Sequence, residues 1–567
     1  MIFMINFFKK HKRSLGAYAL FAFLSFVAIV PFFAANRIFG QGDLLFHLNR
    51  ILGIAEGLKQ GELPYRVFNV LADTGSAVNF FYPFVYILGF SVLFNAINNV
   101  VMAFYIGEMI LLFVTLIVAY QVMMSFSKKN QLQSILFAVL YGFASYRSYL
   151  AFDQFVLGEA FAYAFLPIAF LGLYHVVLGD YKKWPTLAAG VALVLYAHML
   201  SVVLMIAAFI ALVLIAVLFR QVTDYGRRLF ALIKAVVLAL ALSAVVYIPF
   251  LYALRQTSIT TTIQQPIIFL NGLGENILRS LNDQYQNIGV LGIMAVIIGI
   301  VVLFQKKYTQ NAVWWGIGTA LFVMGTTVFP WHALPMSIQA LVQFPYRVFG
   351  MATLFLMVFL SKALVDLFGD RKSIRWVVII ITLFAMVGWF GKATELKNTR
   401  SEQPVLTAAN QDKNQMTSFS ANSDEVKSII NTDYNYIGMV DYAPNASWVP
   451  VNRDSILRGE TLVNDRVTSV KEKAGVTRTR FTVETTQPSV VDVPIFRYGN
   501  ESVKLDGKKT AASTSKRGTV AVSVGAGQHT ISVGYKTPTW IGFAWILSIA
   551  TWLGLAVTAA IRRFRNK

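Results

Sequence analysis

The sequence contains no cysteine and few charged residues. Of its 567 positions, only 14% are charged, and cysteine is absent. The absence of cysteine excludes disulfide bonds and thiolate metal sites. An ordinary soluble domain carries about 25% charged residues, so the shortage of charge argues against that class of protein.

Several sequence motifs of catalysis and nucleotide binding are also missing. We find no Walker phosphate loop, no dinucleotide fingerprint, no HExxH zinc helix and no GxSxG elbow. These absences argue against a nucleotide-driven pump and a serine hydrolase.

Apolar residues are abundant instead, and they are clustered. They make up 56% of the chain, and the mean hydropathy is +0.59. Several runs approach or reach the ~20 residues that a helix needs to cross ~30 Å of hydrocarbon. Examples are 17–33, 100–118, 202–219 and 290–304. The first run follows a basic segment and lacks a small-residue cleavage site, so it predicts a signal anchor. The composition predicts an integral membrane protein with many spans.

The net charge of +21 is explained by the ends of these runs. Basic residues that flank apolar segments are typical of the cytoplasmic side of a membrane, whereas a nucleic-acid site would gather them on one face. We therefore expect no nucleic-acid partner. The flanking residues are Lys128, Lys129, Lys182, Lys183, Arg227, Arg228, Lys306, Lys307, Arg371, Lys372, Arg375, Arg562, Arg563 and Arg565.

Keeping these basic clusters inside predicts about twelve transmembrane helices and two cytoplasmic termini. An external loop at 36–99 contains an interfacial helix at 43–60 and a re-entrant or interfacial piece at 80–94. The predicted spans are 15–35, 100–126, 132–150, 156–178, 185–199, 201–219, 231–252, 287–304, 312–330, 346–364, 375–392 and 539–560.

Between 393 and 538 the composition becomes polar. Its later half alternates apolar and polar residues at 479–483, 520–524 and 529–533, and Asp506-Gly507 and 525–527 are turn signals. We predict an extracytoplasmic domain with a β-sandwich in its later half, placed outside by the parity of the spans. Residues 1–392 form the polytopic domain, and 539–567 form a final helix with a basic cytoplasmic tail.

The first group of candidate functional residues lies at the start of the external loop. On a helix, Asp43, His47 and Arg50 fall on one strip beside an apolar face. Ionisable groups at a membrane boundary are costly, so such a strip is a candidate site. The alternative is that Asp43 caps the helix while His47 and Arg50 face the headgroups.

A second group lies at a predicted external turn between two spans. It contains Arg147, Asp153 and Glu159, and Glu159 opens a long apolar run where a carboxylate needs a partner. The alternative is a carboxylate favoured by the helix dipole, with Arg147 as its salt bridge.

Two further candidates are single residues. Arg347 begins an apolar span after Pro345-Tyr346, and a guanidinium there suits a phosphate group. An interfacial anchor in an aromatic belt is the alternative. His198 lies near the external junction of two spans, where a lone histidine is more often a hydrogen-bonded structural residue than a ligand, so it is a candidate only in company with the others.

Together these residues resemble a known family. The chain is similar to the bacterial membrane proteins called 6-pyruvoyl-tetrahydropterin synthase-related and to their YfhO-type relatives, of the GT-C superfamily of polyprenyl-phosphate-dependent glycosyltransferases. Nothing in the sequence supports pterin chemistry. The features that carry the resemblance are Gly42-Asp43-Leu44-Leu45-Phe46-His47, Phe81-Tyr82-Pro83-Phe84, Gly158-Glu159 with Pro167, Gln343-Phe344-Pro345-Tyr346-Arg347, and the external module with Leu505-Asp506-Gly507-Lys508 and 525–531.

The resemblance implies a GT-C-like fold and an enzyme. Such enzymes move a sugar from a polyprenyl-phosphate carrier to an acceptor outside the membrane. The implied catalytic acid is Asp43, with Asp153 or Glu159 as a second acid. The expected substrate-binding residues are His47, Arg50, Arg147, His198 and Arg347. No cofactor is firmly expected, although a divalent metal at Asp43 and His47 is possible.

The resemblance leaves the acceptor open. A teichoic-acid-like polymer, another cell-envelope glycan and a protein all fit it. Two other functions remain alternatives. One is a transporter or flippase of a lipid-linked sugar or polymer, and the other is a non-catalytic scaffold in envelope assembly.

Overall fold

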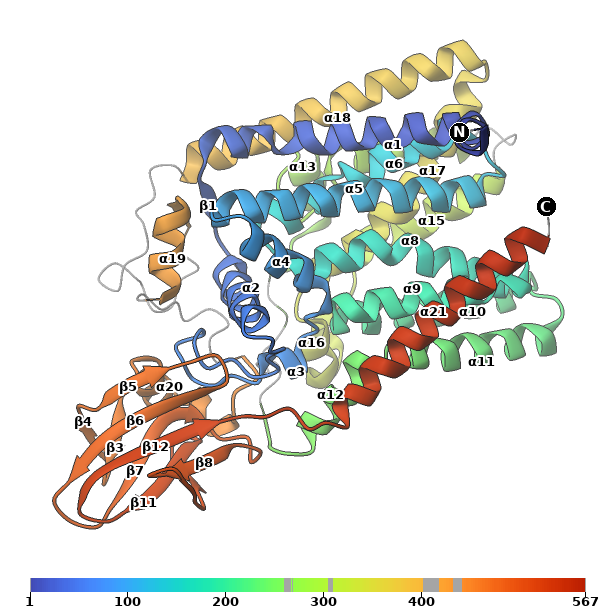
Figure 1. Ribbon diagram of the computed structural model, residues 1–567. Helices are drawn as coiled ribbons and strands as arrows, with labels where there is room; N and C mark the ends of the chain where they lie inside the picture. Colours follow the sequence, from blue (N-terminus) through green and yellow to red (C-terminus); the bar gives the residue numbers. More distant parts are fainter. Residues whose placement is uncertain are drawn as a thin grey trace.

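The computed structural model describes residues 2–259, 267, 269–303, 309–400, 418–431 and 441–565. It is mostly helical, with a β-rich region in two sheets near the C-terminus. The long helices lie side by side in one bundle (Figure 1). The β-rich region stands beyond one end of this bundle, and both ends of the chain lie at the opposite end.

Seven helices in the described part of the chain are long and apolar enough to cross a membrane. Two further pairs would each form one span if a bend is allowed, so helix length supports seven to nine crossings, fewer than the twelve predicted. The seven helices are α1 (Ile2–Ala35), α5 (Val100–Phe126), α8 (Leu157–Val177), α10 (Met199–Leu218), α17 (Phe349–Phe368), α18 (Arg371–Arg400) and α21 (Ile541–Arg565).

The two bent pairs fall on predicted spans that are interrupted. In the predicted span 132–150, α6 (Gln131–Gly142) stops before α7 (Ser145–Ser148) and the π-helix η2 (Tyr149–Asp153), with a bend of 46°. In the predicted span 231–252, α11 (Tyr225–Leu242) and α12 (Ala244–Leu254) meet at 73°.

The other three predicted spans contain short helices. These are α9 (Pro185–Ala197), α14 (Gly289–Leu303) and α15 (Thr309–Met324). With 13 residues, α9 is only about 20 Å long, less than the ~30 Å hydrocarbon core. Its close packing on α8 requires small residues, because a Cβ at Gly190 would lie 2.4 Å from the backbone nitrogen of Ala169.

The external loop is more enclosed than the sequence suggested. Its helix α2 (Leu44–Lys59) is buried on most of its surface, including His47, Asn49 and Arg50. The alternative in which His47 and Arg50 face the lipid headgroups is therefore wrong. The polar strip is covered by later parts of the chain, which the local pattern does not reveal. The other helices of the loop are α3 (Val78–Phe81), η1 (Val85–Ile87) and α4 (Leu88–Ala96).

A strand pair and a helix from the second half of the chain help to cover this loop. β1 (Ile38–Gly40) pairs with β2 (Phe419–Ala421) in antiparallel register, and α19 (Ser423–Asn431) follows. Arg37 joins the two segments through Ser420 and through Glu425, whose Oε2 lies 3.0 Å from its Nη2. The start of the external loop is thus held by residues almost 400 positions away.

The β-rich module (residues 461–534) consists of two five-stranded antiparallel sheets. The three strands predicted from alternation are confirmed as β6, β11 and β12. The first sheet has the order β10 (Ser513–Thr514), β11 (Thr519–Val524), β7 (Ser489–Phe496), β3 (Thr461–Val463), β4 (Arg466–Thr468). The second has the order β5 (Lys471–Ala474), β6 (Arg478–Thr485), β12 (Gly527–Gly534), β8 (Ser502–Leu505), β9 (Lys508–Lys509).

The two sheets share one apolar core. Val491 and Val522 from the first sheet cluster with Phe481 and Ile531 from the second, and Phe68 of the external loop joins them. Because side chains alternate along each strand, this core takes every second residue and leaves the others on the outer faces.

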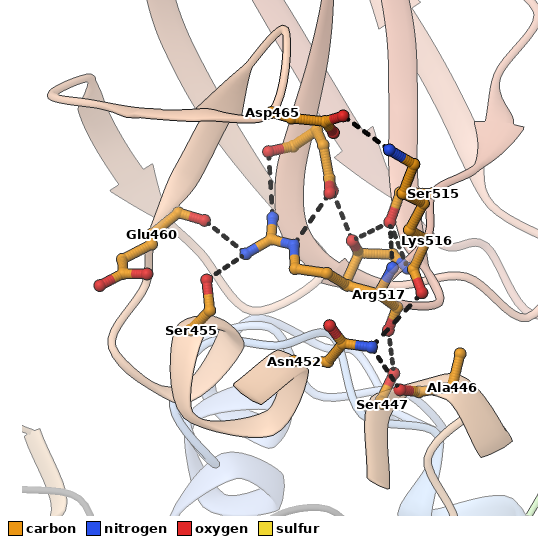
Figure 2. A network of polar contacts seen from close by, with 11 residues as sticks. Ala446, Ser447, Asn452, Ser455, Glu460, Asp465, Ser515, Lys516 and Arg517 are labelled. Carbon is orange, nitrogen blue, oxygen red and sulfur yellow. Dashed lines mark hydrogen bonds and ion pairs between the residues drawn. The ribbon is translucent and has the colours of Figure 1, made fainter. Parts of the chain in front are cut away.

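The irregular segment before the module is fastened to it by buried Arg517 (Figure 2). Its Nε donates to Asp492 at 2.9 Å, and its Nη1 donates to Ser455 Oγ and to the Glu460 carbonyl, each at 2.9 Å. Ser447 in turn donates to the Arg517 carbonyl. This network ties η7 (Asn445–Trp448) and α20 (Pro450–Leu457) to the first sheet.

The module is also locked to the external loop. The side chain of Arg66 is fully buried; its Nη1 lies 2.6 Å from Glu501 Oε1, and its Nη2 donates to the Phe496 carbonyl.

The predicted domain boundary between 392 and 393 falls inside a helix, since α18 continues to Arg400. The remaining helices are η3 (Tyr181–Lys183), α13 (Leu273–Leu281), η5 (Trp331–Ala333), α16 (Met336–Val342) and η6 (Pro345–Val348).

Candidate functional site

A cavity of about 740 Å³ lies among the helix ends that face the module. It is bounded by the start of α2, the end of η2, the start of α8, η6 and the end of α18. Four candidates from the sequence line it together: Asp43, Asp153, Glu159 and Arg347. The other lining residues are Gln41, Tyr149, Gln154, Val156, Phe269, Arg279, Gln284, Tyr285, Gln286, Phe344, Tyr346, Glu395, Leu396, Thr399, Arg400 and Ser418.

Asp43 is held in place by its backbone. It is the residue before α2, and its N–H donates to the Gln154 carbonyl at 2.9 Å. The preceding Gly42 has φ +57°, and a Cβ there would lie 2.3 Å from Gln154 Oε1, so this position requires glycine. The carboxylate makes no capping bond to the helix, and no described residue bonds to it or forms an ion pair with it.

The surroundings of Asp43 favour its protonated form. Burial, followed by the negative charge of Asp441, raises the pKa of Asp43 to about 7, and the nearby Arg347 opposes this rise. Burial likewise raises the pKa of Asp441 to about 6. A carboxylate with a pKa near 7 is suited to accept a proton at neutral pH.

Glu159 and Arg347 face each other across the cavity wall. The Glu159 Oε2 lies 3.6 Å from Arg347 Nε, and its Oε1 accepts a hydrogen bond from the Tyr146 hydroxyl. Arg347 Nη1 donates to Gln343 Oε1 at 2.6 Å. Its Nη2 has no partner among the described residues, so one edge of the guanidinium is open to an anion.

The Asp153 carboxylate, in contrast, already has a partner within the protein. Its carboxylate forms an ion pair with Arg400, which also donates to the Phe39 carbonyl at 3.0 Å. Arg400 is not among the site residues predicted from the sequence. A signal was present, since Trp389, Ala393, Leu396 and Arg400 follow helical spacing and are all buried, which shows that α18 extends beyond its apolar run.

Aromatic rings form a further wall. The Phe344 and Tyr346 rings are stacked with their centroids 5.4 Å apart, and the Tyr149 hydroxyl donates to the Tyr346 hydroxyl at 3.0 Å. Amide side chains of Gln154 and Gln286 lie in the same lining. Flat apolar surfaces beside several hydrogen-bonding groups suit a ligand that has both C–H faces and hydroxyls, such as a sugar.

Two members of the predicted polar strip do not line this cavity. Arg50 donates to Asn79 Oδ1 at 3.1 Å and to the Tyr82 carbonyl at 2.9 Å, and lies over the Tyr82 ring. His47 is completely buried against the same ring, and neither of its ring nitrogens has a described partner. Arg50 therefore joins α2 to the segment 79–86.

The remaining predicted substrate-binding residues also lie outside the cavity lining. Arg147 is sealed in the bundle, where its Nη2 lies 3.0 Å from Glu108 Oε2 of α5. His198 stands at the junction of α9 and α10, and its Nδ1 is 2.9 Å from Ser201 Oγ. The salt bridge between Arg147 and Glu159 that the sequence allowed is not formed.

The donor set for a metal ion is sparse. Across the ranges that the structure describes, no group of three or more His, Asp or Glu side chains converges. Hard cations such as Ca²⁺ take six to eight oxygen ligands, so Asp43 with His47 would supply only a small part of a coordination sphere.

No protein-family model and no curated protein sequence matches this chain. The resemblance to GT-C enzymes therefore rests on the residues quoted for it.

Proposed function

We propose that the protein is a membrane glycosyltransferase. It takes a sugar from a polyprenyl-phosphate carrier and transfers it to a cell-envelope acceptor outside the membrane. The observation that carries the proposal is the position of Asp43: a carboxylate without a described partner, with a pKa near 7, in a cavity that also holds the open edge of Arg347.

In the proposed reaction the acceptor hydroxyl attacks the anomeric carbon of the donor sugar. A new C–O bond forms as the bond between that carbon and the phosphate oxygen breaks. Asp43 takes the proton of the attacking hydroxyl. The bonding electrons remain on the leaving carrier phosphate, and the guanidinium of Arg347 stabilises its added negative charge.

The other cavity residues have supporting roles. Glu159 holds Arg347 in position through its carboxylate, and Asp153 is neutralised by Arg400, so neither is as available to a proton as Asp43. The stacked rings of Phe344 and Tyr346 provide a surface for the sugar. This assigns the base to Asp43 and leaves the two other acids as positioning residues.

The proposal includes a topology. The chain crosses the membrane twelve times, with the short helices α9, α14 and α15 among the crossings, and the module lies outside as an extracytoplasmic β-sandwich. It is supported by the arrangement in Figure 1, where both chain ends lie opposite the module. A single cysteine at exposed Lys508 should react with an impermeant thiol reagent on intact cells, whereas one at Arg562 should not. The reverse pattern would invert the topology.

The function is tested with purified protein and a set of polyprenyl-phosphate sugars, by following release of the carrier. Wild type should release carrier when an acceptor is present, and Asp43→Asn should lose at least a hundredfold in rate, as expected for loss of a general base. Membrane abundance should be unchanged. A flippase would tolerate this substitution, and a scaffold would be insensitive to it but would fail when residues 393–538 are removed.

A further inference from the structure

The outer face of the second sheet carries a row of cations. The strand registers place Lys473 of β5 opposite Arg480 of β6, Arg480 opposite Ser532 of β12, Ser532 opposite Lys504 of β8, and Lys504 opposite Lys509 of β9. The basic row, defined as Lys473, Arg480, Lys504 and Lys509, thus crosses all five strands. Strands in a sheet lie about 4.8 Å apart, so the row is roughly 19 Å long.

Alternation along the strands places the row on the surface. Phe481 and Ile531, the neighbours of Arg480 and Ser532, are buried in the core between the sheets. Lys473, Arg480 and Lys509 are exposed, and Lys504 is half-buried. None of the four has a carboxylate partner among the described residues.

Such an arrangement is unfavourable for the sheet alone. Like charges directly opposite one another destabilise an antiparallel pair, and both Lys473–Arg480 and Lys504–Lys509 are such pairs. The same face adds Lys471 and Arg478, while its carboxylates are Glu484 and Asp506, and Asp506 is engaged with His529. The excess positive charge has no counterpart within the module.

The orientation of the module argues against a membrane surface as the group that neutralises the positive charge of the basic row. Strand β12 runs toward the start of α21, and only six residues separate them (Figure 1). The strand axes therefore run between the helix bundle and the far end of the module, and the faces of the sheets are turned to the side. A flat membrane crossed by the helices would meet the end of the module and would not cover the row.

We propose that the basic row binds a polyanionic extracytoplasmic polymer, whose repeated charges lie across the five strands. Lys and Arg side chains are well matched to phosphate oxygens in particular. The inference relies on the proposed external position of the module, but it does not require sugar transfer. It would make the module the part of the protein that holds a charged envelope polymer near the cavity.

The test measures binding of fluorescent poly(glycerol phosphate) to the full-length protein in phosphatidylcholine nanodiscs, over a range of salt concentrations, with neutral dextran as the reference. The row variant replaces its four cations by Gln. The matched control removes the same charge elsewhere. The control substitutions are Lys59→Gln, Lys427→Gln, Arg466→Gln and Lys516→Gln.

Wild type should bind the polymer and not dextran, and affinity should fall with salt. The row variant should bind the polymer at least tenfold more weakly. Its plot of log affinity against log salt concentration should be shallower by about 3, since each neutralised phosphate contributes about 0.7 to the slope. The control and Asp43→Asn should bind the polymer like wild type, and no variant should have a lower melting temperature than wild type.

Three results would overturn the proposal. One is no binding by wild type, and another is an equal loss in the row variant and in the control, which would reflect net charge alone. The third is that phosphatidylglycerol vesicles bind through the row as strongly as the polymer, which would make it a membrane contact. Failure of sugar transfer with retained polymer binding would reject the proposed function and not this inference.

Discussion

Two arginine–glutamate pairs lie in the same bundle and differ in their exposure. Arg147 and Glu108 join α7 to α5 at 3.0 Å, and each side chain is 1% exposed. Arg347 and Glu159 join η6 to α8 at 3.6 Å, with 11% and 9% exposed, and both line the cavity. The first pair is sealed among side chains, whereas the second has access to a ligand.

The comparison shows what gives an ion pair a functional role in this protein. Burying two charges costs as much as their attraction returns, so a sealed pair mainly specifies how helices fit together. A pair at a cavity can change partner, because an entering phosphate can replace the carboxylate at the guanidinium. The residue types are the same in both cases, and the surroundings of the two pairs differ.

Breaking the sealed pair should have the largest effect on stability. Arg147→Ala leaves Glu108 buried without a partner and should destabilise the protein by about 3–5 kcal/mol. Thermal unfolding in detergent measures this loss. Glu108→Gln in the same background should restore part of it, since it removes the orphaned charge. A stable Arg147→Ala protein would show that the pair is not sealed.

Changing the open pair should affect binding more than stability. Arg347→Lys keeps the charge but loses the planar fork, and should weaken donor binding by about 1–3 kcal/mol, or about 5- to 150-fold. The measurement is donor affinity beside melting temperature.

Arg347→Ala distinguishes the two partners of this guanidinium. If the donor phosphate is a partner, the variant binds donor weakly. If Glu159 is the only partner, the variant is less stable, Glu159→Gln partly rescues it, and donor affinity is unchanged. That last outcome would withdraw the phosphate role.

Asp43→Asn should change the stability of the protein in a way that depends on pH. The pKa of Asp43 is about 7 in the folded protein and about 3.9 in an unfolded chain. The folded state therefore binds more protons, and this carboxylate lowers stability increasingly as pH rises from about 4 to 7. Asp43→Asn should melt higher than wild type above pH 7, and the difference should vanish near pH 4. A constant difference across pH would mean that Asp43 is not buried as described.

The sequence predicted the positions of the membrane-length helices and the strands well, because apolar length and alternation are local signals. It also selected Asp43, Asp153, Glu159 and Arg347, which the fold brings to one cavity. These residues stand at the ends of apolar segments, where charge is costly and therefore informative.

Partners and burial could not be predicted in the same way. Arg50 and Arg147 carry the same local pattern as Arg347, but distant segments enclose them: 79–86 surrounds Arg50 and α5 supplies Glu108 to Arg147. Asp441 acts on Asp43 from almost 400 residues away in the sequence, and Arg400 reaches the same cavity because α18 continues past its apolar run. Such contacts depend on tertiary structure.

The central claim is that Asp43 accepts a proton during sugar transfer. The most direct test is the pH dependence of kcat/KM for carrier release between pH 5 and 9, in wild type and in Asp43→Asn. In wild type, kcat/KM should rise about tenfold per pH unit and level off above an apparent pKa of about 7, and Asp43→Asn should be inactive throughout. A flat profile in wild type, or an Asp43→Asn enzyme that keeps the wild-type rate, would contradict it.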